Sequence, residues 1–479
     1  MRASGFEQIW RAFAQVEEAE NLADWQVAGV YLWPILRDRL MREVAEQLGV
    51  YQKRQDVSAS VAAASVSAPT EFQLAPSGYA VMPFVRRNSD GIDPFSVEII
   101  RSLEAAGAKP LVFGVGPEDF GSGRPQVEHL ERLFFNRHRL ASKLRVAPSV
   151  LPIFGGAKHI AKHARVIAFL EKALPQSAFE TASSGTLSGG SIAGRFKPFP
   201  RWLLVEFVAH RTGWKALFQK AGVKKLFVVN AWKRALIAGA QAAGVWVVEP
   251  QHGLLSNRHP LLAWPNRKTV AYLPNELLLW GDYWAQETDL PKSVLPTIIG
   301  EPKSLVNLRE KAAAGTRVAG TVLVVSQAQQ TTQILDIALR AADANPGLVF
   351  TLKPHPQELK SQFADHLTSV GRSLPANLHL ASPLESAFDL IAASEFVVGV
   401  HSMALVEALA LGAKVVAVAL PGYENIESIA ILGDLILAPI DSDLRSELGQ
   451  ATLAQNPGYY FAPALAPEFF TALLLSERQ

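Results

Sequence analysis

Short apolar runs alternate with amphipathic stretches along most of the chain. Residues 79–116 read as an apolar run, a polar loop, a helical stretch and a second apolar run: YAVMPFV, RRNSDGIDP, FSVEIIRSLEAAG and KPLVFGVG. The same order begins again at KLFVVN, residues 225–230, and at TVLVV, residues 321–325. A strand, a crossover helix and a second strand form a βαβ unit, and such units build parallel sheets covered by helices. The pattern therefore predicts the α/β class.

The βαβ series is interrupted once, by a polar and Ala-rich stretch at 303–319 that reads as a hinge. We therefore predict two Rossmann-like domains, over 78–302 and 320–479, which face a cleft suited to a ligand. The last helix belongs to the second domain and can cross back to the first. Helical spacing predicts an N-terminal helical segment over 1–56, and the Ser/Ala-rich residues 57–77 read as a linker.

Composition narrows the functional classes. The chain has 479 residues, of which 49% are hydrophobic and 19% charged, a balance typical of a globular protein with a large core. Its net charge is +2 with Lys and Arg spread along the chain, which argues against a nucleic-acid partner. It contains no cysteine, which excludes disulfides, thiol nucleophiles and Cys-ligated zinc. We find no signal peptide and no membrane span, and we predict a cytoplasmic protein.

A Lys and a His each stand directly before a proline in LVFTLKPHPQE, residues 348–358. A proline favours an extended residue before it, and side chains two apart on an extended chain point the same way. Lys353 and His355 are therefore expected to form a cationic fork at the carboxyl end of a strand, where α/β proteins bind ligands. The alternative is a strand that ends in a Pro-rich turn, with His355 on the surface.

A second candidate site lies in VVGVHSMALVEALALGAK, where a buried strand leads directly into a helix. Ser402 is the predicted N-cap and Gly412 the helix stop. A helix start offers N–H groups to an anion. Glu407 is the one charged residue of this helix, so it needs solvent or a hydroxyl partner such as a ribose. The alternative is that Ser402 only caps the helix and that Glu407 marks its exposed face.

Both segments belong to one predicted sheet, and together they indicate a nucleotide-phosphate pocket. The residues assigned to donor binding lie at strand ends of that sheet: Ser326, Gln327, Lys353, His355, His401, Ser402, Met403 and Glu407. His401 can instead play a structural role by holding the loop.

The order of these motifs resembles a known class of enzymes. KPHP followed about 45 residues later by HSMALVEAL is similar to the C-terminal half of bacterial surface-polysaccharide glycosyltransferases of GT-B fold. That class includes sialyltransferases and polysialyltransferases with a His-Pro motif and the capsule-type Kdo transferases. EPQHGLLSNRHP, LLLWGDYW and IIGEP extend the resemblance over roughly 245–425. It implies that His355 contacts the nucleotide phosphate, that Ser402 binds phosphate and that Glu407 contacts the nucleoside.

The N-terminal half matches this class less closely. The sialyltransferases carry an acidic pair followed by Gly, and one of the two carboxylates is the catalytic base. The nearest match is SDG at 89–91 with Asp93 beyond it, so the base is expected to be Asp93 or Asp90. Because one acid of the pair matches, the stereochemical course stays open, and both can be turn residues. His252 in QHG follows a strand end, where it faces the cleft or bonds to backbone.

The function expected from these features is transfer of a sugar from a nucleotide-activated donor to a bacterial surface glycan. The resemblance favours a CMP-activated ulosonic acid such as sialic acid or Kdo, with no cofactor and no divalent metal. The alternatives are a UDP-sugar transferase or epimerase, a polyol-phosphate transferase, and a non-catalytic sugar-binding protein. Bases and aromatic residues interleave in RFKPFPRWLLVEF, residues 195–207, as in a peripheral membrane contact at the inner face or an ordinary helix start.

Overall fold

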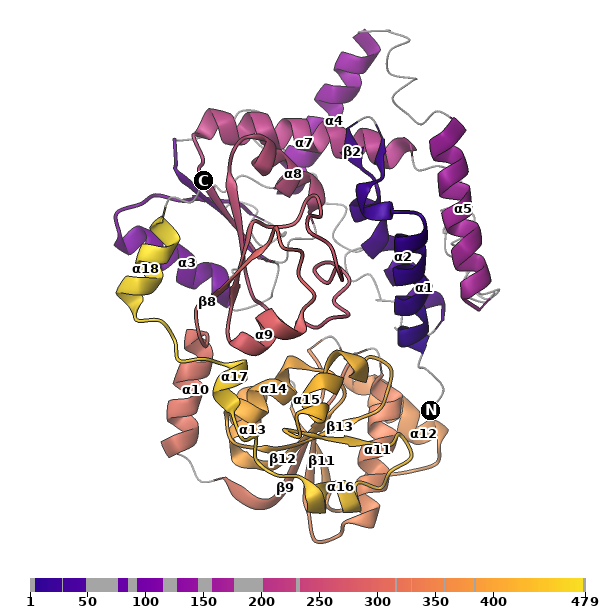
Figure 1. Ribbon diagram of the computed structural model, residues 1–479. Helices are drawn as coiled ribbons and strands as arrows, with labels where there is room; N and C mark the ends of the chain where they lie inside the picture. The colour runs from indigo at the N-terminus through magenta and orange to yellow at the C-terminus, as the bar shows by residue number, and fades with distance from the viewer. Residues whose placement is uncertain are drawn as a thin grey trace.

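The computed structural model consists of two α/β domains, one above the other in the view of Figure 1, with additional helices along one side of the upper domain. It describes residues 5–27, 29–48, 76–84, 93–114, 127–144, 157–175, 201–229, 233–314, 317–328, 330–356, 358–382 and 385–476. The predicted linker lies mostly outside these residues, as does the first part of the basic and aromatic stretch at 195–207.

The first domain is built on a six-stranded sheet of order β4-β3-β5-β6-β7-β8, in which every neighbouring pair is parallel. Its strands are β3 (Tyr79–Met82), β4 (Leu111–Val112), β5 (Lys225–Val228), β6 (Trp246–Pro250), β7 (Glu276–Leu279) and β8 (Leu295–Ile298). Its helices are α3 (Pro94–Ala105), α4 (Val127–Leu144), α7 (Arg201–Ala221), α8 (Arg234–Ala242) and α9 (Asp282–Glu287). α10 (Lys303–Ala314) leads to the second domain.

The second domain has its own parallel six-stranded sheet, of order β11-β10-β9-β12-β13-β14. Its strands are β9 (Val318–Val325), β10 (Val349–Lys353), β11 (Leu378–Leu380), β12 (Ser394–Gly399), β13 (Lys414–Val418) and β14 (Ile436–Ala438). Its helices are α11 (Thr331–Ala344), α12 (Lys360–Ser369), α13 (Ala387–Ala393), α14 (Met403–Ala410), α15 (Glu427–Ile431) and α16 (Arg445–Gln450). The predicted α/β class with two parallel sheets is confirmed. The predicted strands at 225–230 and 321–325 lie in different sheets.

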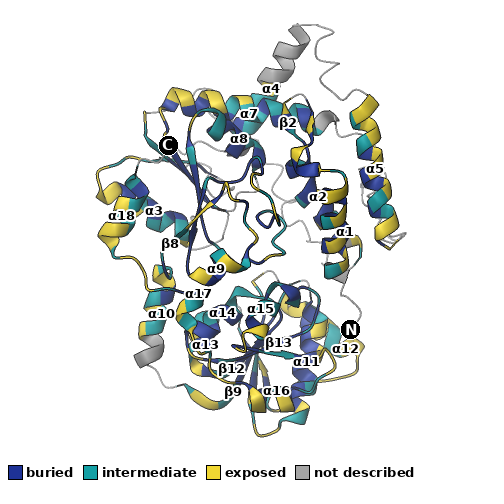
Figure 2. Cartoon of the chain, in the orientation of Figure 1, coloured by how far each residue is buried: buried dark blue, intermediate teal, exposed yellow. Residues whose placement is uncertain are grey.

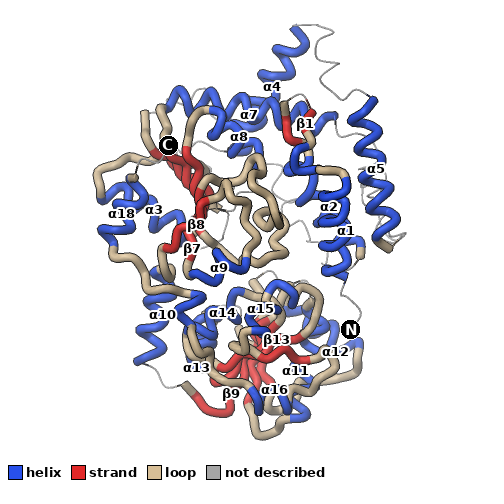
Figure 3. The backbone as a smooth tube through the Cα atoms, viewed as in Figure 1, coloured by secondary structure: helices blue, strands red, loops and turns tan. Residues whose placement is uncertain are grey.

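The two sheets form the buried interior of the molecule, and helices surround them (Figures 2 and 3). In the second sheet the chain runs β9, β10, β11 to one edge and then returns to β12 on the other side of β9. A parallel sheet opens a crevice at such a reversal, at the carboxyl ends of its strands. Gly399 lies there, and a Cβ on it would come 2.6 Å from the side chain of Val325, so the strands approach closely. The reversal places the crevice between β9 and β12.

The N-terminal segment packs into the first domain. It comprises α1 (Gly5–Ala19), η1 (Leu22–Asp24), the short hairpin β1 (Gln26–Val27) and β2 (Val30–Tyr31), and α2 (Trp33–Gln47), with α5 (Ala157–Ala173) against it. Arg37 is 1% exposed, and its guanidinium lies 5.0 Å from the ring centroid of Trp10 and 4.3 Å from that of Trp264. Its Nε is 2.5 Å from Glu17 Oε1. A buried cation therefore joins both helices of this segment to the first domain.

The end of the chain returns to the first domain. After α17 (Pro457–Tyr460), α18 (Pro467–Leu475) packs against α3. Buried Lys225 donates from Nζ to the carbonyls of Leu474 at 2.9 Å and Ser476 at 2.6 Å. Trp284 Nε1 donates to the carbonyl of Tyr460 at 2.7 Å. One apolar cluster accordingly continues from the first domain into the second. Within the described part of the chain, no helix is both long and apolar enough to span a membrane.

Buried histidines predict how stability depends on pH. His163 on α5 is 2% exposed beside Trp25, and burial lowers the pKa of His163 to about 4. The unfolded chain binds this proton near pH 6.5, so its contribution to stability is complete above pH 6.5 and is lost as the pH falls toward 4. By pH 5 the loss should be on the order of 2 kcal/mol in the free energy of unfolding.

Urea unfolding at pH 7 and pH 5 measures this loss. His163→Asn should show a smaller difference between the two pH values than the unsubstituted protein does. His379→Asn, at an exposed position on β11, controls for the substitution itself. Equal pH dependence in the His163 variant and the unsubstituted protein would contradict the assignment.

Candidate functional site

Four loops of the second domain meet at one edge of its sheet. β9 pairs in parallel with β10 on one side and with β12 on the other, and β12 pairs with β13. The segments that follow these strands therefore leave the sheet on the same side. They begin at Ser326, Pro354, Val400 and Ala419. The structure thus gathers the loops that contain most of the residues predicted to bind the donor.

A buried carboxylate connects two of these loops. Glu358, which is 8% exposed, accepts from the backbone N–H of His355 at 2.5 Å through Oε2. Its Oε1 accepts from the hydroxyl groups of Ser326, at 2.8 Å, and Thr331. The N–H of Glu358 donates in turn to the carbonyl of His355 at 2.9 Å. Both backbone groups of His355 are therefore bonded to one residue, which fixes the His-Pro turn against the loop after β9.

Lys353 supports the loop on the other side of β10. It is 7% exposed, and Nζ donates to the carbonyl of Ser382 at 3.0 Å. Burial lowers the pKa of Lys353, and the nearby carboxylate of Glu385 partly offsets that effect. Glu385 also accepts from the N–H of Ser382. The ammonium group thus holds the backbone at Ser382, and the Lys–His fork stays a prediction.

His401 is held between two loops. Its ring Nε2 lies 3.0 Å from Nε2 of Gln327, and its backbone N–H donates to Gln327 Oε1 at 3.4 Å. Gly422, in the loop after β13, has φ +102°, and a Cβ there would lie 2.4–2.5 Å from the imidazole. Burial lowers the pKa of His401 to about 4, so the ring is neutral at pH 7. The structure therefore favours the structural role for His401.

The predicted helix start is confirmed at α14. Ser402 is its N-cap, and the hydroxyl accepts from the N–H of Ala404 at 3.2 Å. The helix stops at Gly412, which has φ +79°. Met403 and Glu407 are half-buried on this helix. Three residues separate the carboxyl end of β12 from α14, so the amino end of α14 lies at this edge of the sheet, where an anion can bind.

Asp93 is the N-cap residue of α3 in the first domain, and it binds the backbone just after β3. It is 0% exposed and precedes α3, which has a proline in its first turn. Its Oδ1 accepts from the N–H of Ser96 at 2.9 Å and its Oδ2 from the N–H of Phe84 at 2.8 Å. Both oxygens are engaged away from solvent, which favours the structural alternative over the catalytic base. Asp90 lies outside the described residues.

His252 lies at the same edge of the first sheet, two residues after β6. Its Nδ1 is 3.7 Å from Oε1 of Glu249, which is 3% exposed, and its ring lies 6.2 Å from that of Phe84. The imidazole is 21% exposed. It is therefore accessible to solvent and adjacent to a buried carboxylate, a combination suited to a general base. Among the described residues, no group of three or more His, Cys, Asp or Glu is arranged to hold a metal ion.

Several residues of the site have no signal in the sequence. Glu358 and Gln330 act across loops, and Gln330 Nε2 donates to the carbonyl of Pro421 at 2.6 Å. Ser256 Oγ donates to Asn425 Oδ1 at 2.8 Å, across the two domains. The sequence hint nearest to these contacts is PGYEN after β13, which reads only as a loop. Only their contacts in the folded protein identify these residues as part of the site.

The chain resembles known proteins only at the level of solved structures. No protein-family model matches the sequence. No curated protein matches it. Solved structures that resemble it include a glycosyltransferase from Rickettsia africae ESF-5, with 10% identity, a TM-score of 0.38, and coverage of 83% of this chain and 94% of that chain. The UDP-GlcNAc 2-epimerase from Methanocaldococcus jannaschii has 12% identity, a TM-score of 0.44, and coverage of 83% and 99%.

MurG from Acinetobacter baumannii gives 12% identity and a TM-score of 0.43, over 83% of this chain and 98% of that chain. At these identities and TM-scores the resemblances carry no inference about activity, donor or acceptor. The functional assignment of this chain depends on its own residues and their geometry.

Glu358→Gln tests the network behind His355. The amide would place an N–H₂ group toward buried donors, so we expect a loss of about 2 kcal/mol in the free energy of unfolding. Urea unfolding measures it, and Asp365→Asn at an exposed position of α12 is the matched control. A Glu358 variant as stable as this control would mean that the carboxylate does not hold the turn.

Asp93→Ala tests the cap of α3. Loss of a capping side chain costs about 1–2 kcal/mol, so the free energy of unfolding should fall by that amount. Chemical denaturation at pH 7 measures it. If stability stayed unchanged while turnover was abolished, Asp93 would be a catalytic residue rather than a cap.

Proposed function

We propose that this protein is a glycosyltransferase that takes its sugar from a nucleotide-activated donor. The observation that supports this most is the convergence of the His355 turn, the Gln327–His401 pair and the amino end of α14 at one sheet edge. A helix start and a backbone turn that carries an accessible histidine suit the phosphate of a nucleotide. Glu407, one and a half turns into α14, is the candidate for a ribose hydroxyl.

The donor that this arrangement suits is a CMP-activated ulosonic acid, such as sialic acid or Kdo. Such a donor carries one phosphate, already bonded to the sugar, and the site offers one helix start and one histidine turn. No step of this proposal needs a divalent metal. The acceptor proposed is a bacterial surface glycan, reached at the inner face of the membrane when it is lipid-linked.

The proposed chemistry divides between the two domains. His355 donates a hydrogen bond to the leaving phosphate oxygen as negative charge grows on it. His252, whose Nδ1 lies 3.7 Å from Glu249 Oε1, removes the proton from the attacking acceptor hydroxyl. That assignment takes the role of base away from Asp93, whose two oxygens bind backbone N–H groups. The proposed base, His252, then belongs to the first domain, and His355, which donates a hydrogen bond to the phosphate, belongs to the second.

Two variants separate catalysis by His355 from donor binding by Glu407. His355→Ala removes a donor aimed at developing charge, so turnover should fall about a hundredfold while donor affinity changes little. Glu407→Ala should mainly weaken donor binding. Steady-state kinetics and isothermal titration calorimetry measure the two effects.

A thermal-shift screen with CMP, CDP, UDP, GDP and their sugars identifies the donor. Stabilisation by UDP-sugars alone would favour a UDP-sugar transferase or epimerase over the CMP-sugar reading. Binding of a donor without hydrolysis or transfer would favour a sugar-binding protein. His355→Ala with normal turnover would show that the prolines around it serve only the turn.

A further inference from the structure

Arg258 bridges three parts of the molecule. It lies in the loop between β6 and β7 of the first domain, and its side chain is 17% exposed. Nε lies 2.7 Å from Glu7 Oε2 on α1. Nη1 donates to the carbonyl of Glu424 at 2.9 Å, and Nη2 lies 3.3 Å from Glu427 Oε2. One guanidinium therefore contacts the N-terminal helix and the second domain at once.

The part of the second domain that Arg258 contacts is the loop that supports His401. Within this loop, Asn425 Nδ2 donates to the carbonyl of Gly422 at 3.0 Å, and Gly422 packs directly against the imidazole of His401. Glu424, 3% exposed, accepts from the N–H of Gly422 at 2.8 Å. Displacement of residues 422–427 would therefore move the wall of the donor site.

Two further contacts from the first domain hold this segment and Ser428, the residue that follows it. Ser256 donates to Asn425, as described above, and the hydroxyl of Tyr283 on α9 lies 2.7 Å from that of Ser428. Each of these is a single contact between neutral side chains, whereas the charged, planar guanidinium of Arg258 binds three partners in a fixed geometry. The N-terminal helix contributes the carboxylate that completes it. Burial raises the pKa of Glu7, but bonds from Arg11 and Arg258 outweigh this and lower it.

We infer that Arg258 and Glu7 form an interdomain clamp that positions residues 422–427 for donor binding. This gives the N-terminal helical segment a role in the function of the second domain. The inference rests on the proposed function in one respect, namely that the site beside His401 takes a nucleotide. Arg258 is a positioning residue, because it acts through Gly422 and His401.

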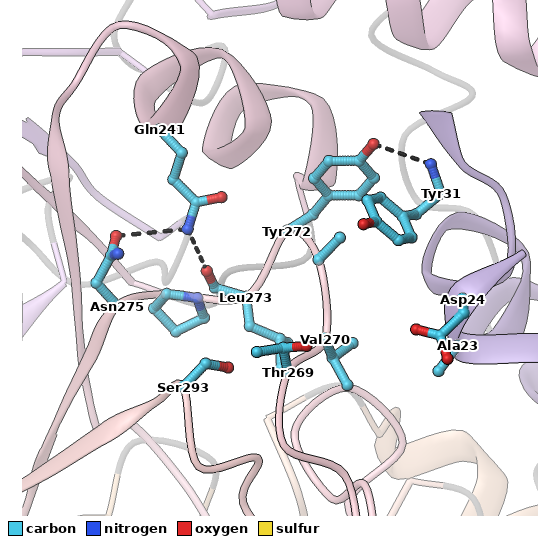
Figure 4. A pocket seen from close by; sticks show the side chains of 12 residues that line it. Ala23, Asp24, Tyr31, Gln241, Thr269, Val270, Tyr272, Leu273, Asn275 and Ser293 are labelled. Atoms are coloured by element: carbon cyan, nitrogen blue, oxygen red, sulfur yellow. Dashed lines mark hydrogen bonds between the residues drawn. The ribbon is translucent and has the colours of Figure 1, made fainter. Parts of the chain in front are cut away.

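The amino end of α1 lies toward the second domain, as the clamp requires (Figure 1). A cavity of about 190 Å³ at the edge of the N-terminal segment lies elsewhere. It is lined by Ala23, Asp24 and Tyr31 of that segment and by residues 269–275, with Gln241 bonded to Leu273 and Asn275 (Figure 4). It is not part of the clamp.

The first experiment measures the geometry of the clamp without a ligand. Because the chain has no cysteine, Lys292→Cys and Ser369→Cys place two spin labels at exposed positions of the first and second domains without background labelling. Pulsed dipolar spectroscopy should give a narrow distance distribution in the unsubstituted background. Arg258→Ala and Glu7→Gln should broaden it. Unchanged distributions in both variants would overturn the clamp.

The matched control is Arg11→Ala. Arg11 is the other cation bound to Glu7, at 2.8 Å, but its side chain is 66% exposed and the pair lies within a single helix. It should leave the distribution as it is. If Arg258→Ala does not fold, Glu7→Gln and Arg258→Lys provide the same comparison, since Lys keeps the charge and loses the fork.

The second experiment measures nucleotide affinity by calorimetry with CMP and with UDP. Arg258→Ala should weaken binding about fivefold or more, as is typical of coupling between sites, and Glu7→Gln should weaken it less. The double variant should bind no more weakly than Arg258→Ala, because both substitutions break one clamp. Unchanged affinity alongside a broadened distance distribution would overturn the positioning role. If the unsubstituted protein bound neither nucleotide, the proposed function would fail, while the distance measurement would still decide the clamp.

Discussion

Strands that are covered by helices on both faces consist mainly of apolar residues. Residues 322–325 of β9 are at most 5% exposed and are all Val or Leu, and the first polar side chains, Ser326 and Gln327, come where the strand ends. Because β10 and β12 flank β9 in parallel, the segments that follow them, from Pro354 and from Val400, leave the sheet at the same edge. Strand register therefore determines where the candidate site residues of the second domain lie, and contacts between the loops determine how their side chains are arranged.

Local patterns in the sequence predict the strand ends and the helix start, since apolar runs, the Ser402 cap and Gly412 are all short-range features. They do not predict the role of Glu358, whose hydroxyl partners lie 32 and 27 residues earlier in the chain. Which hydroxyl meets a carboxylate depends on how β9 and β10 pair. Asp93 differs, because an Asp followed by Pro at a helix start is itself a cap signal. The local rule describes this residue better than the resemblance does.

The N-terminal segment is an integral part of the first domain. Arg37 donates to the carbonyl of Pro260, 223 residues later, while two tryptophan rings flank its guanidinium. Removing one partner of a buried ion pair costs about 3–5 kcal/mol, because the remaining charge stays buried. Arg258 lies in the same loop, where it contacts Glu7 of α1 and also Glu424 and Glu427 of the second domain. Helical periodicity alone predicts these helices but gives no sign of that connection.

The cap of α3 and the candidate base His252 are physically linked. Asp93 holds the N–H of Phe84, and the ring of Phe84 lies beside the imidazole of His252. A substitution of Asp93 can therefore disturb the base by shifting Phe84, even though Asp93 has no oxygen directed at a substrate. Loss of turnover in an Asp93 variant identifies a catalytic carboxylate only where the free energy of unfolding is unchanged. Where both fall together, loss of the cap explains both effects, and His252 beside Glu249 stays the proposed base of the first domain.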